Sequence, residues 1–497
     1  MSQNVLVIGA GFAGLSAAIT LARQGHHVTV VEKHATPGGR ARAFSEKGFT
    51  FDMGPSWYWM PEVAADFFKR NDRCIEDYFS LIRLDPSYQV IFGKDDSILL
   101  PAAFSEICQL FDSIESGSGE KLRQFMAEAE YKYKTAMKTY ISKPGLRIGE
   151  LCNVEVLQSF LKMDMLQSFR HHVKHYFKDE RLLRIIEFPI LFLGATADKI
   201  PAMYSMMNYA DMQLGTWYPK GGMAQLAWAF NKLATESGVK LCLNTEVEKL
   251  EVVKDKVLGA YTSKGFFSAD VVVSGADYHH TDRQLLPADK SNYSAAYWDK
   301  RTMAPSCLIY YIGVNRKIPR LQHHNLFFEH DLQQHAASIY TKPSWPTHPL
   351  FYLCCPSKTD ATVAPAGMEN LFYLIPTAPG LEDTPAIREQ YLKQVLAETA
   401  AYCNDKFEQD IIYCRSYAYS DFISDYHAYK GNAYGLANTL GQTAFLKPSI
   451  RHKKIKNLFF TGQLTVPGPG VPPAILSGEM VANYISSLKF GKHEVTI

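Results

Sequence analysis

Three glycines near the N-terminus have the spacing of a phosphate-binding turn. Gly9, Gly11 and Gly14 follow an apolar, β-branched run at residues 4–8, and a helical stretch comes directly after them. The first glycine permits a sharp bend, the second lets the backbone approach a pyrophosphate, and the third lets the helix lie close to the strand. The helix N-terminus then presents free N–H groups to the phosphates. Glu32 ends the next apolar run, HVTVVE, where a carboxylate accepts hydrogen bonds from a ribose.

This context predicts a dinucleotide-binding βαβ unit, which NAD and FAD would both fit. Gly38, Gly39 and Arg40 help to separate them, because they offer a second close backbone approach and a guanidinium that can reach phosphate oxygens. The alternative is an ordinary turn with a surface arginine. The pattern EKxxxxGGR resembles the superfamily of flavin-containing amine oxidases and carotenoid desaturases, in which it marks tightly held FAD.

The C-terminal part supplies a second ligand-facing turn. A buried-looking strand at 457–461 leads through Gly462 and Gln463 into a loop rich in proline and glycine, and a helix follows. This order again points backbone N–H groups at a ligand. The segment FFTGQLTVPGPGVPPAILSGEMVA resembles the flavin-binding signature of bacterial phytoene desaturases, and the segments at 49–61 and 217–230 resemble two further elements of that family. The resemblance spans the whole chain.

The resemblance implies the fold and the cofactor. We expect an α/β protein with a Rossmann-type FAD-binding domain (GR2-like) and an inserted α+β substrate domain. It also implies that Val247 faces the adenine through its backbone. Gln463 departs from the wider superfamily, in which an acid commonly stands there, although an amide can still bind the flavin's ribityl hydroxyls. The expected FAD-binding residues are Gly9, Gly11, Phe12, Ala13, Gly14, Glu32, Lys33, Gly38, Gly39, Arg40, Val247, Gly462, Gln463, Gly470, Val471 and Pro472.

Element patterns predict a discontinuous cofactor domain. Apolar alternation and turn residues indicate strands in the first and last parts of the chain, with a hairpin at 88–100, whereas 101–216 has a helical period. Strands such as SCLIYYIGV and LFYLIP suggest a second sheet. The expected FAD-binding domain comprises 1–95, 217–280 and 411–497. The expected substrate and membrane-contact domain comprises 96–216 and 281–410.

Composition excludes several other classes. Of 497 residues, 52 are basic and 50 are acidic, so a net charge of +2 gives no general attraction to nucleic acid. The nine cysteines show no CxxC spacing, which argues against zinc ribbons, iron–sulfur clusters and a disulfide scaffold, and suits a reducing cytosol. No apolar run reaches the roughly 18–20 residues of a membrane-spanning helix, and the early first strand leaves no room for a signal peptide.

Several residues admit both a chemical and a packing interpretation. Trp57, Tyr58, Trp59 and Met60 could be core or a wall of a substrate channel. The methionines of 200–212 pose the same alternative. His171 and His175 have a metal-binding spacing, but without a third ligand a solvated helix face is expected and no metal site is predicted. The doublets His279-His280 and His323-His324 are predicted in loops, and Cys354-Cys355 is predicted in the core.

The resemblance implies an FAD-dependent carotenoid desaturase that acts stepwise on phytoene, a C40 polyene, by hydride transfer to the flavin. The sequence does not identify catalytic side chains. An apolar substrate leads us to expect a cytoplasmic enzyme held peripherally on the membrane through an apolar patch of 101–216. Its electron acceptor would be oxygen or quinone. The alternatives are a desaturase, ketolase or isomerase of a later carotenoid (for example a hydroxycarotenoid 3,4-desaturase), a flavin amine oxidase, and a non-catalytic carrier.

Overall fold

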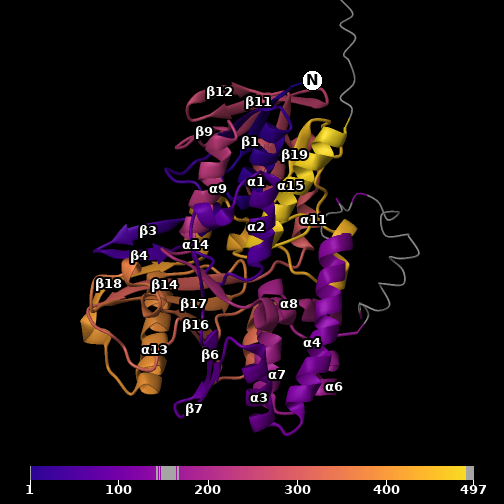
Figure 1. Ribbon diagram of the computed structural model, residues 1–497. Helices are drawn as coiled ribbons and strands as arrows, with labels where there is room; N and C mark the ends of the chain where they lie inside the picture. Colours follow the sequence, from indigo (N-terminus) through magenta and orange to yellow (C-terminus); the bar gives the residue numbers. More distant parts are fainter. Residues whose placement is uncertain (1, 141–143, 145, 147–163, 165–166, 489–497) are drawn as a thin grey trace, which may run out of the picture.

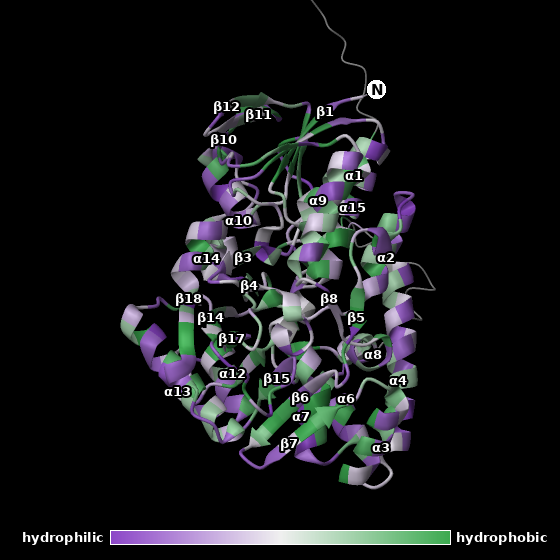
Figure 2. Ribbon diagram, turned by 60° about the vertical axis from the view of Figure 1, so that its left-hand side comes forward, coloured by the Kyte–Doolittle hydropathy of each residue, from purple (hydrophilic) through white to green (hydrophobic). Residues whose placement is uncertain are grey.

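The computed structural model describes residues 2–140, 144, 146, 164 and 167–488, and two sheets organise it (Figure 1). The first sheet has five parallel strands, rich in valine and largely buried, as is usual for a parallel sheet covered by helices. They appear as hydrophobic strands around β1 in Figure 2. Their order is β19 (Leu458–Phe460), β13 (Val271–Ser274), β1 (Asn4–Ile8), β2 (His27–Val31) and β9 (Lys240–Cys242).

Helices from distant parts of the chain cover this parallel sheet. α1 (Phe12–Arg23) contacts both α9 (Ala224–Glu236) and α15 (Val471–Ser487). α1 and α15 approach closely because Gly478 has no side chain, and a Cβ there would lie 2.2 Å from the carbonyl oxygen of Ala13. The packing brings the predicted N-terminal and C-terminal turns to one edge of the sheet.

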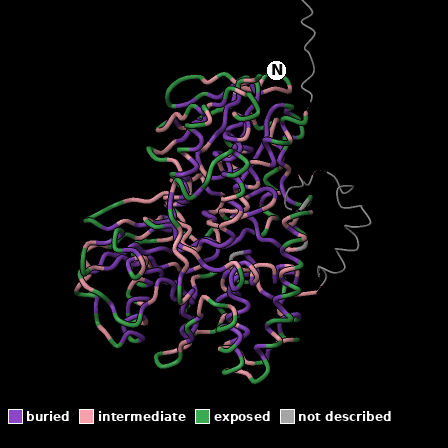
Figure 3. The backbone as a smooth tube through the Cα atoms, in the orientation of Figure 1, coloured by how far each residue is buried: buried purple, intermediate pink, exposed green. Residues whose placement is uncertain are grey.

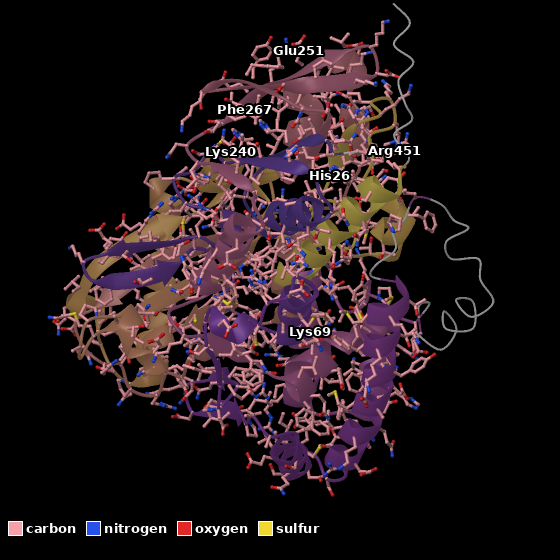
Figure 4. The ribbon with its side chains drawn as sticks, turned by 45° about the horizontal axis from the view of Figure 1, so that its top comes forward. His26, Lys69, Lys240, Glu251, Phe267 and Arg451 are labelled. Carbon is pink, nitrogen blue, oxygen red and sulfur yellow. The ribbon has the colours of Figure 1, made fainter. Side chains whose placement is uncertain are left out.

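An antiparallel three-stranded sheet lies beside the parallel one. Its strands are β10 (Val247–Val253), β11 (Lys256–Thr262) and β12 (Gly265–Ser268). Figure 4 shows Lys240, Glu251 and Phe267, from β9, β10 and β12, at the same end of the molecule. The strands expected between 239 and 275 are therefore confirmed.

The second sheet has seven strands of mixed direction. Their order is β18 (Ile411–Tyr417), β14 (Ser306–Val314), β17 (Glu369–Thr377), β16 (Phe351–Cys354), β15 (His324–Phe327), β6 (Tyr88–Gly93) and β7 (Asp96–Leu100). All neighbours are antiparallel except β15 and β6. α13 (Pro385–Cys403) packs on it through a shared apolar cluster. The predicted hairpin and second sheet are confirmed.

The remaining elements are mostly helical. Among the described residues, 101–216 forms helices as its period predicts. These helices are α3 (Phe104–Ile114), α4 (Ser118–Thr135), α6 (Phe169–Tyr176), α7 (Glu180–Glu187) and α8 (Met206–Tyr209). The others are α2 (Pro61–Arg70), α10 (Tyr278–His280), α11 (Ala295–Asp299), α12 (Leu332–Tyr340) and α14 (Tyr419–Tyr426). Two small antiparallel pairs are β3 (Ala43–Glu46) with β4 (Phe49–Asp52), and β5 (Leu81–Arg83) with β8 (Trp217–Pro219).

Sheet membership bears on where the two domains divide. β6, β7 and β18 all belong to the seven-stranded sheet. The boundaries expected after residue 95 and before residue 411 would cut that sheet, although strands bonded in one sheet belong to one core. We therefore propose that the first segment of the cofactor domain ends before β6 and that its last segment begins after β18.

Buried backbone runs through both sheets and the region between them (Figure 3). The largest apolar cluster spans the first sheet, the aromatic segment at 57–60 and the helices α3 to α8. Among the residues that the structure describes, no helix combines the length and the apolar character needed to cross a bilayer.

Candidate functional site

The N-terminal glycine turn has the geometry that its spacing predicts. Gly9 has φ +92°, and its N–H donates to Val31 O at 2.8 Å, which ties the turn to β2. A Cβ on Gly14 would lie 2.0 Å from Gly9 O, so α1 can lie this close to β1 only with glycine there. α1 starts after Gly11, and no side chain caps its first N–H groups. These groups are therefore available to an anion.

Glu32 is buried at the carboxyl end of β2. Its Oε2 accepts a hydrogen bond from Ala10 N at 2.7 Å, and its Oε1 accepts one from His34 N at 3.0 Å. The side chain is 6% exposed, so these backbone bonds fix its orientation. Each carboxylate oxygen has a further lone pair, and the pair can receive ribose hydroxyls.

A cavity of about 310 Å³ connects the two ends of the chain around this carboxylate. Most of the predicted FAD-binding residues line it, but Gly14 lies behind it against β1, and Pro472 lines the neighbouring cavity instead. The predicted residues on the wall are Gly9, Gly11, Phe12, Ala13, Glu32, Lys33, Gly38, Gly39, Arg40, Val247, Gly462, Gln463, Gly470 and Val471. Helix N-termini at α1 and α15, a carboxylate placed to accept ribose hydroxyls, and a cavity between them together fit FAD.

Arg40 contributes an unsatisfied donor to this cavity. Its Nη2 donates to Asn432 O at 3.3 Å, but the buried Nε has no hydrogen-bond partner among the described residues. The guanidinium carbon lies 5.0 Å from the ring centre of Tyr426. A buried guanidinium N–H needs an acceptor, and a phosphate oxygen of the cofactor is one of suitable charge.

Some wall residues were not predicted from the sequence. They include His34, Met53, Gly54, Asp277, Tyr426, His427, Ala433 and Tyr434. His34, Met53 and Gly54 lie within the segments 32–40 and 49–61 but were not singled out there, whereas the others reach the cavity through tertiary packing. Gln463 also lines it and donates from Nε2 to Asn432 Oδ1 at 3.0 Å, which leaves its carbonyl oxygen and its second N–H for the cofactor.

A second cavity, of about 410 Å³, lies next to the first. Trp57, Tyr58, Trp59 and Met60 all line it, as do methionines 203, 206 and 207, whereas Met212 is buried in the core. Its histidine, His335, is bonded to protein on both ring nitrogens: Nε2 lies 2.8 Å from Pro376 O, and Nδ1 accepts from Leu350 N at 2.8 Å. The wall is therefore largely apolar and suits a long hydrocarbon.

The two cavities share part of their walls. The residues that line both are Gly54, Pro55, Leu374, Tyr434, Pro469, Gly470 and Val471. A cofactor whose phosphates lie at α1 and whose far end reaches the start of α15 would present that end to the second cavity. This is the arrangement required for transfer between an FAD ring and an apolar substrate.

The loop prediction for the histidine doublets holds for His323, which lies in a bend, but it is wrong for His324 in β15 and for the doublet in α10. His323 and His324 are fully enclosed, and His324 begins β15 with its ring stacked on Trp57 at a centroid distance of 4.0 Å. Burial lowers the pKa of His323 to about 3 and that of His324 well below its ordinary value, so both rings are neutral. No local pattern indicates this burial, because the polar doublet resembles a loop until β16 pairs with it.

The other histidine doublet lies outside loops, and the remaining candidates lie where they were predicted. His279 and His280 lie on α10, and burial lowers the pKa of His280 to about 3. His171 and His175 are exposed on α6, as predicted. Both Cys354 and Cys355 are buried, which confirms them as core residues.

Lys447 places a buried amine behind the wall of the second cavity. Its Nζ donates to Asn438 Oδ1 at 2.7 Å, and burial lowers its pKa to about 7. Between about pH 7 and 10.5 the unfolded chain binds a proton that the folded chain does not, so stability rises with pH across this window, by roughly 5 kcal/mol at most.

We expect Lys447→Met to flatten this rise in denaturant unfolding, while Lys393→Met, at an exposed site, leaves it unchanged. An unaltered pH profile in Lys447→Met would contradict the burial argument.

The Glu32 geometry predicts a specific loss of cofactor affinity. Glu32→Gln keeps the shape of the side chain but replaces one carboxylate oxygen by an NH₂ group. That group faces a backbone N–H from which the carboxylate oxygen accepts a hydrogen bond. We expect the Kd for FAD to rise roughly 10- to 100-fold, since hydrogen bonds to charged groups contribute about 1.5–3 kcal/mol. Fluorescence titration of apoprotein measures this, with Glu46→Gln on exposed β3 as the control. Equal Kd values for both variants would show that Glu32 does not hold the ribose.

The fold and the site define a dinucleotide-binding flavoprotein, and comparisons with known proteins agree. The family described as flavin containing amine oxidoreductase matches residues 12–486. The chain is 38% identical over 481 residues, 97% of each chain, to the carotenoid 3,4-desaturase of Haloarcula japonica. It is 30% identical to the zeta-carotene-forming phytoene desaturase of Myxococcus xanthus, over 96% of this chain and 93% of that one.

Solved structures show the same fold at low sequence identity. A putative protoporphyrinogen oxidase from Exiguobacterium sp. 255-15 superposes with a TM-score of 0.60 at 13% identity, covering 98% of this chain and 99% of the other. Wild-type putrescine oxidase superposes with a TM-score of 0.61 at 13% identity, covering 98% of this chain and 100% of the other. The chain belongs to the flavin containing amine oxidoreductases and, within them, to the carotenoid desaturase family. The predicted family, fold class, oxidoreductase class and FAD cofactor are thereby confirmed.

Proposed function

We propose that this protein introduces conjugated double bonds stepwise into phytoene. The observation that carries the proposal is the largely apolar cavity of about 410 Å³ whose wall is continuous with that of the FAD cavity at Gly54, Pro55 and Leu374. A hydrocarbon without polar end groups suits a largely apolar wall whose histidine, His335, is bonded to protein on both ring nitrogens. FAD, when bound, supplies the acceptor for a hydride from a carbon flanked by double bonds.

The chain's own residues contribute to this reaction by orienting the substrate and excluding water from it. Trp57 stacks between aromatic neighbours, with its ring centre 5.0 Å from that of Phe188 and 5.4 Å from that of Tyr352. Trp59 is held by a hydrogen bond from Nε1 to Thr216 Oγ1 at 2.9 Å. A rigid aromatic wall confines an extended polyene beside the cofactor. Binding the polyene therefore also orients it for the reaction.

A second candidate is the desaturation of a terminal bond in a carotenoid that is already conjugated. The 38% identity to a carotenoid 3,4-desaturase favours it. An amine substrate is disfavoured, because no aspartate or glutamate is among the described residues on the wall of the second cavity to pair with a cation. A ketolase or isomerase would use the same cavity and differs in its product.

Membrane contact is a further part of the proposal. Phe445 lines the second cavity and is 37% exposed, and its neighbour Leu446 is 41% exposed, so we place the entrance for a bilayer-soluble substrate at this lip. Part of the region expected for this role, 101–216, lies outside the described residues, namely 141–143, 145, 147–163 and 165–166. Liposome flotation should be weaker for Phe445→Asp than for Val253→Asp, at an exposed apolar site on β10.

Oxygen or quinone remains our proposal for the electron acceptor.

Expression in a bacterial host that accumulates phytoene tests the substrate. We expect new long-wavelength bands in the pigment extract, with chromatography giving the number of double bonds formed. A parallel host that makes hydroxylated, conjugated carotenoids tests the 3,4-desaturation. Conversion only in the second host, with FAD-loaded protein present in both, would replace phytoene by the later carotenoid.

A further inference from the structure

Desaturation releases a proton as well as a hydride, and the largely apolar cavity needs an exit for that proton. We propose that Tyr352 is a catalytic residue that takes the substrate proton, and that His324, His323 and one water carry it to Thr359 near the surface. The inference rests on the desaturation proposed above, whichever carotenoid is the substrate. Four observations carry it: the place of Tyr352, its bond to His324, the second imidazole, and a small chamber beside it.

Tyr352 lies close to where the two cavities share a wall. It lines the second cavity on β16, and its register neighbour on β17 is Leu374, which lines both cavities. Ser56, the residue after Pro55, also lines the second cavity and interacts with the Tyr352 hydroxyl. A substrate carbon held beside the cofactor is therefore near this hydroxyl.

The Tyr352 hydroxyl is bonded to a neutral imidazole. It lies 2.6 Å from His324 Nδ1, and burial keeps that ring unprotonated. With Nδ1 as the acceptor, the hydrogen of His324 is on Nε2, an atom that is buried and has no hydrogen-bond partner among the described residues. Stacking on Trp57 fixes the ring in this orientation.

A second imidazole continues the path toward solvent. The ring centres of His323 and His324 are 4.5 Å apart, and ligand-type atoms of His323, His324 and Cys354 lie within 4.8 Å of one another. His323 Nε2 is likewise buried without a partner among the described residues, whereas its Nδ1 lies 2.7 Å from Oγ1 of the half-buried Thr359. Two orphaned ring nitrogens side by side require an explanation.

A chamber of about 20 Å³ supplies the missing partner. His323 and Cys354 line it together with Ser56, Asp52 and Tyr218. That volume accommodates one water, and the polar side chains on an otherwise largely apolar wall offer it hydrogen-bond partners. Asp52 accepts from Met223 N and Ala224 N at 2.7 and 2.9 Å, and burial raises its pKa to about 6. A water here would satisfy His323 Nε2, and because the His324 ring lies beside that of His323 we place this water between the two rings.

The chemistry of the step balances without a further reagent. One substrate hydrogen leaves with its electron pair to FAD, which gives an allylic cation that is a very strong carbon acid. The electron pair of the neighbouring C–H bond becomes the new double bond, and its proton goes to a lone pair on Tyr352 Oη. The Tyr352 O–H proton passes to His324 Nδ1 as His324 releases its Nε2 proton to the water. So strong an acid needs only a positioned lone pair.

Anaerobic single-turnover reduction of bound FAD, with the polyene that the wild type accepts, tests the relay. We expect Tyr352→Phe to slow reduction about a hundredfold and to yield rearranged products, with FAD content and Tm unchanged. Tyr373→Phe removes a buried tyrosine hydroxyl from the same sheet, outside both cavities, and should react like the wild type. His324→Gln keeps an acceptor for Tyr352 but cannot pass the proton on, so both it and His324→Leu should slow reduction.

Two results would overturn the relay while leaving the desaturase assignment intact. One is a Tyr352→Phe rate equal to that of Tyr373→Phe. The other is a stoichiometric metal ion in the purified protein, since it would occupy the ring nitrogens that the relay uses. A wild type that leaves its flavin oxidised with every carotenoid would instead defeat the proposed function and the relay together. Nitrogen-15 spectra of histidine-labelled protein give an independent readout, because the His324 Nδ1 signal should move in Tyr352→Phe.

Discussion

Replacing Gly14 by alanine should abolish stable FAD binding. The new Cβ would lie 2.0 Å from the carbonyl oxygen of Gly9, and that oxygen belongs to the turn itself, so α1 must move away from β1. The shift withdraws the uncapped N–H groups at the start of α1 from the phosphates. Losing two hydrogen bonds to a charged group, at about 1.5–3 kcal/mol each, raises the Kd for FAD roughly a hundredfold or more.

The strain should also appear in the apoprotein, because overpacking costs about 1–3 kcal/mol. FAD content after purification and denaturant unfolding of the apo form measure the two effects. Gly441→Ala is the matched control, since a Cβ added at Gly441 would have nothing within 4 Å of it and the backbone there has an ordinary φ. Normal FAD content in Gly14→Ala would show that the turn tolerates displacement and would remove the steric argument.

Replacing Ala336 by tryptophan should block the substrate cavity and spare the cofactor. Ala336 is buried on α12 and lines the second cavity but not the first, so the indole would occupy space that an extended polyene needs. We expect carotenoid turnover to fall roughly a hundredfold, as small displacements from a reactive geometry do. FAD content and photoreduction of the bound flavin should remain at wild-type values.

The neighbouring residue provides the control for this variant. Ala337 is exposed on the same helix, so Ala337→Trp adds the same side chain outside the cavity. Turnover in this variant should match the wild type. If Ala336→Trp kept full turnover, the cavity of about 410 Å³ would not be the substrate site.

Local sequence patterns predicted the cofactor-binding half of the molecule, because short stretches of sequence determine its turns. The turn at Gly9–Gly14, the position of Glu32 and the strand–loop–helix before Gly478 each depend on residues close in sequence. The second site depends on contacts between residues about 300 positions apart. Trp57 meets His324, and the Tyr352 hydroxyl lies beside Ser56, only after β15 and β16 join the seven-stranded sheet.

The same reason explains what sequence patterns place poorly. β6 pairs in parallel with β15, more than 200 residues away, and periodicity carries no information on such a partner. The domain boundary expected near residue 95 therefore cuts through one sheet. Composition singles out the aromatic segment at 57–60, but only the structure shows that it lines a cavity next to the one that fits the cofactor.

The most direct test of the account is an anaerobic mixture of FAD-loaded protein with phytoene carried in lipid vesicles. We expect the oxidised flavin absorbance to disappear while an equal amount of a polyene with a longer chromophore forms, and air or quinone to restore the flavin. Flavin that stays oxidised beside unchanged phytoene, yet bleaches with light, would contradict phytoene desaturation by this protein.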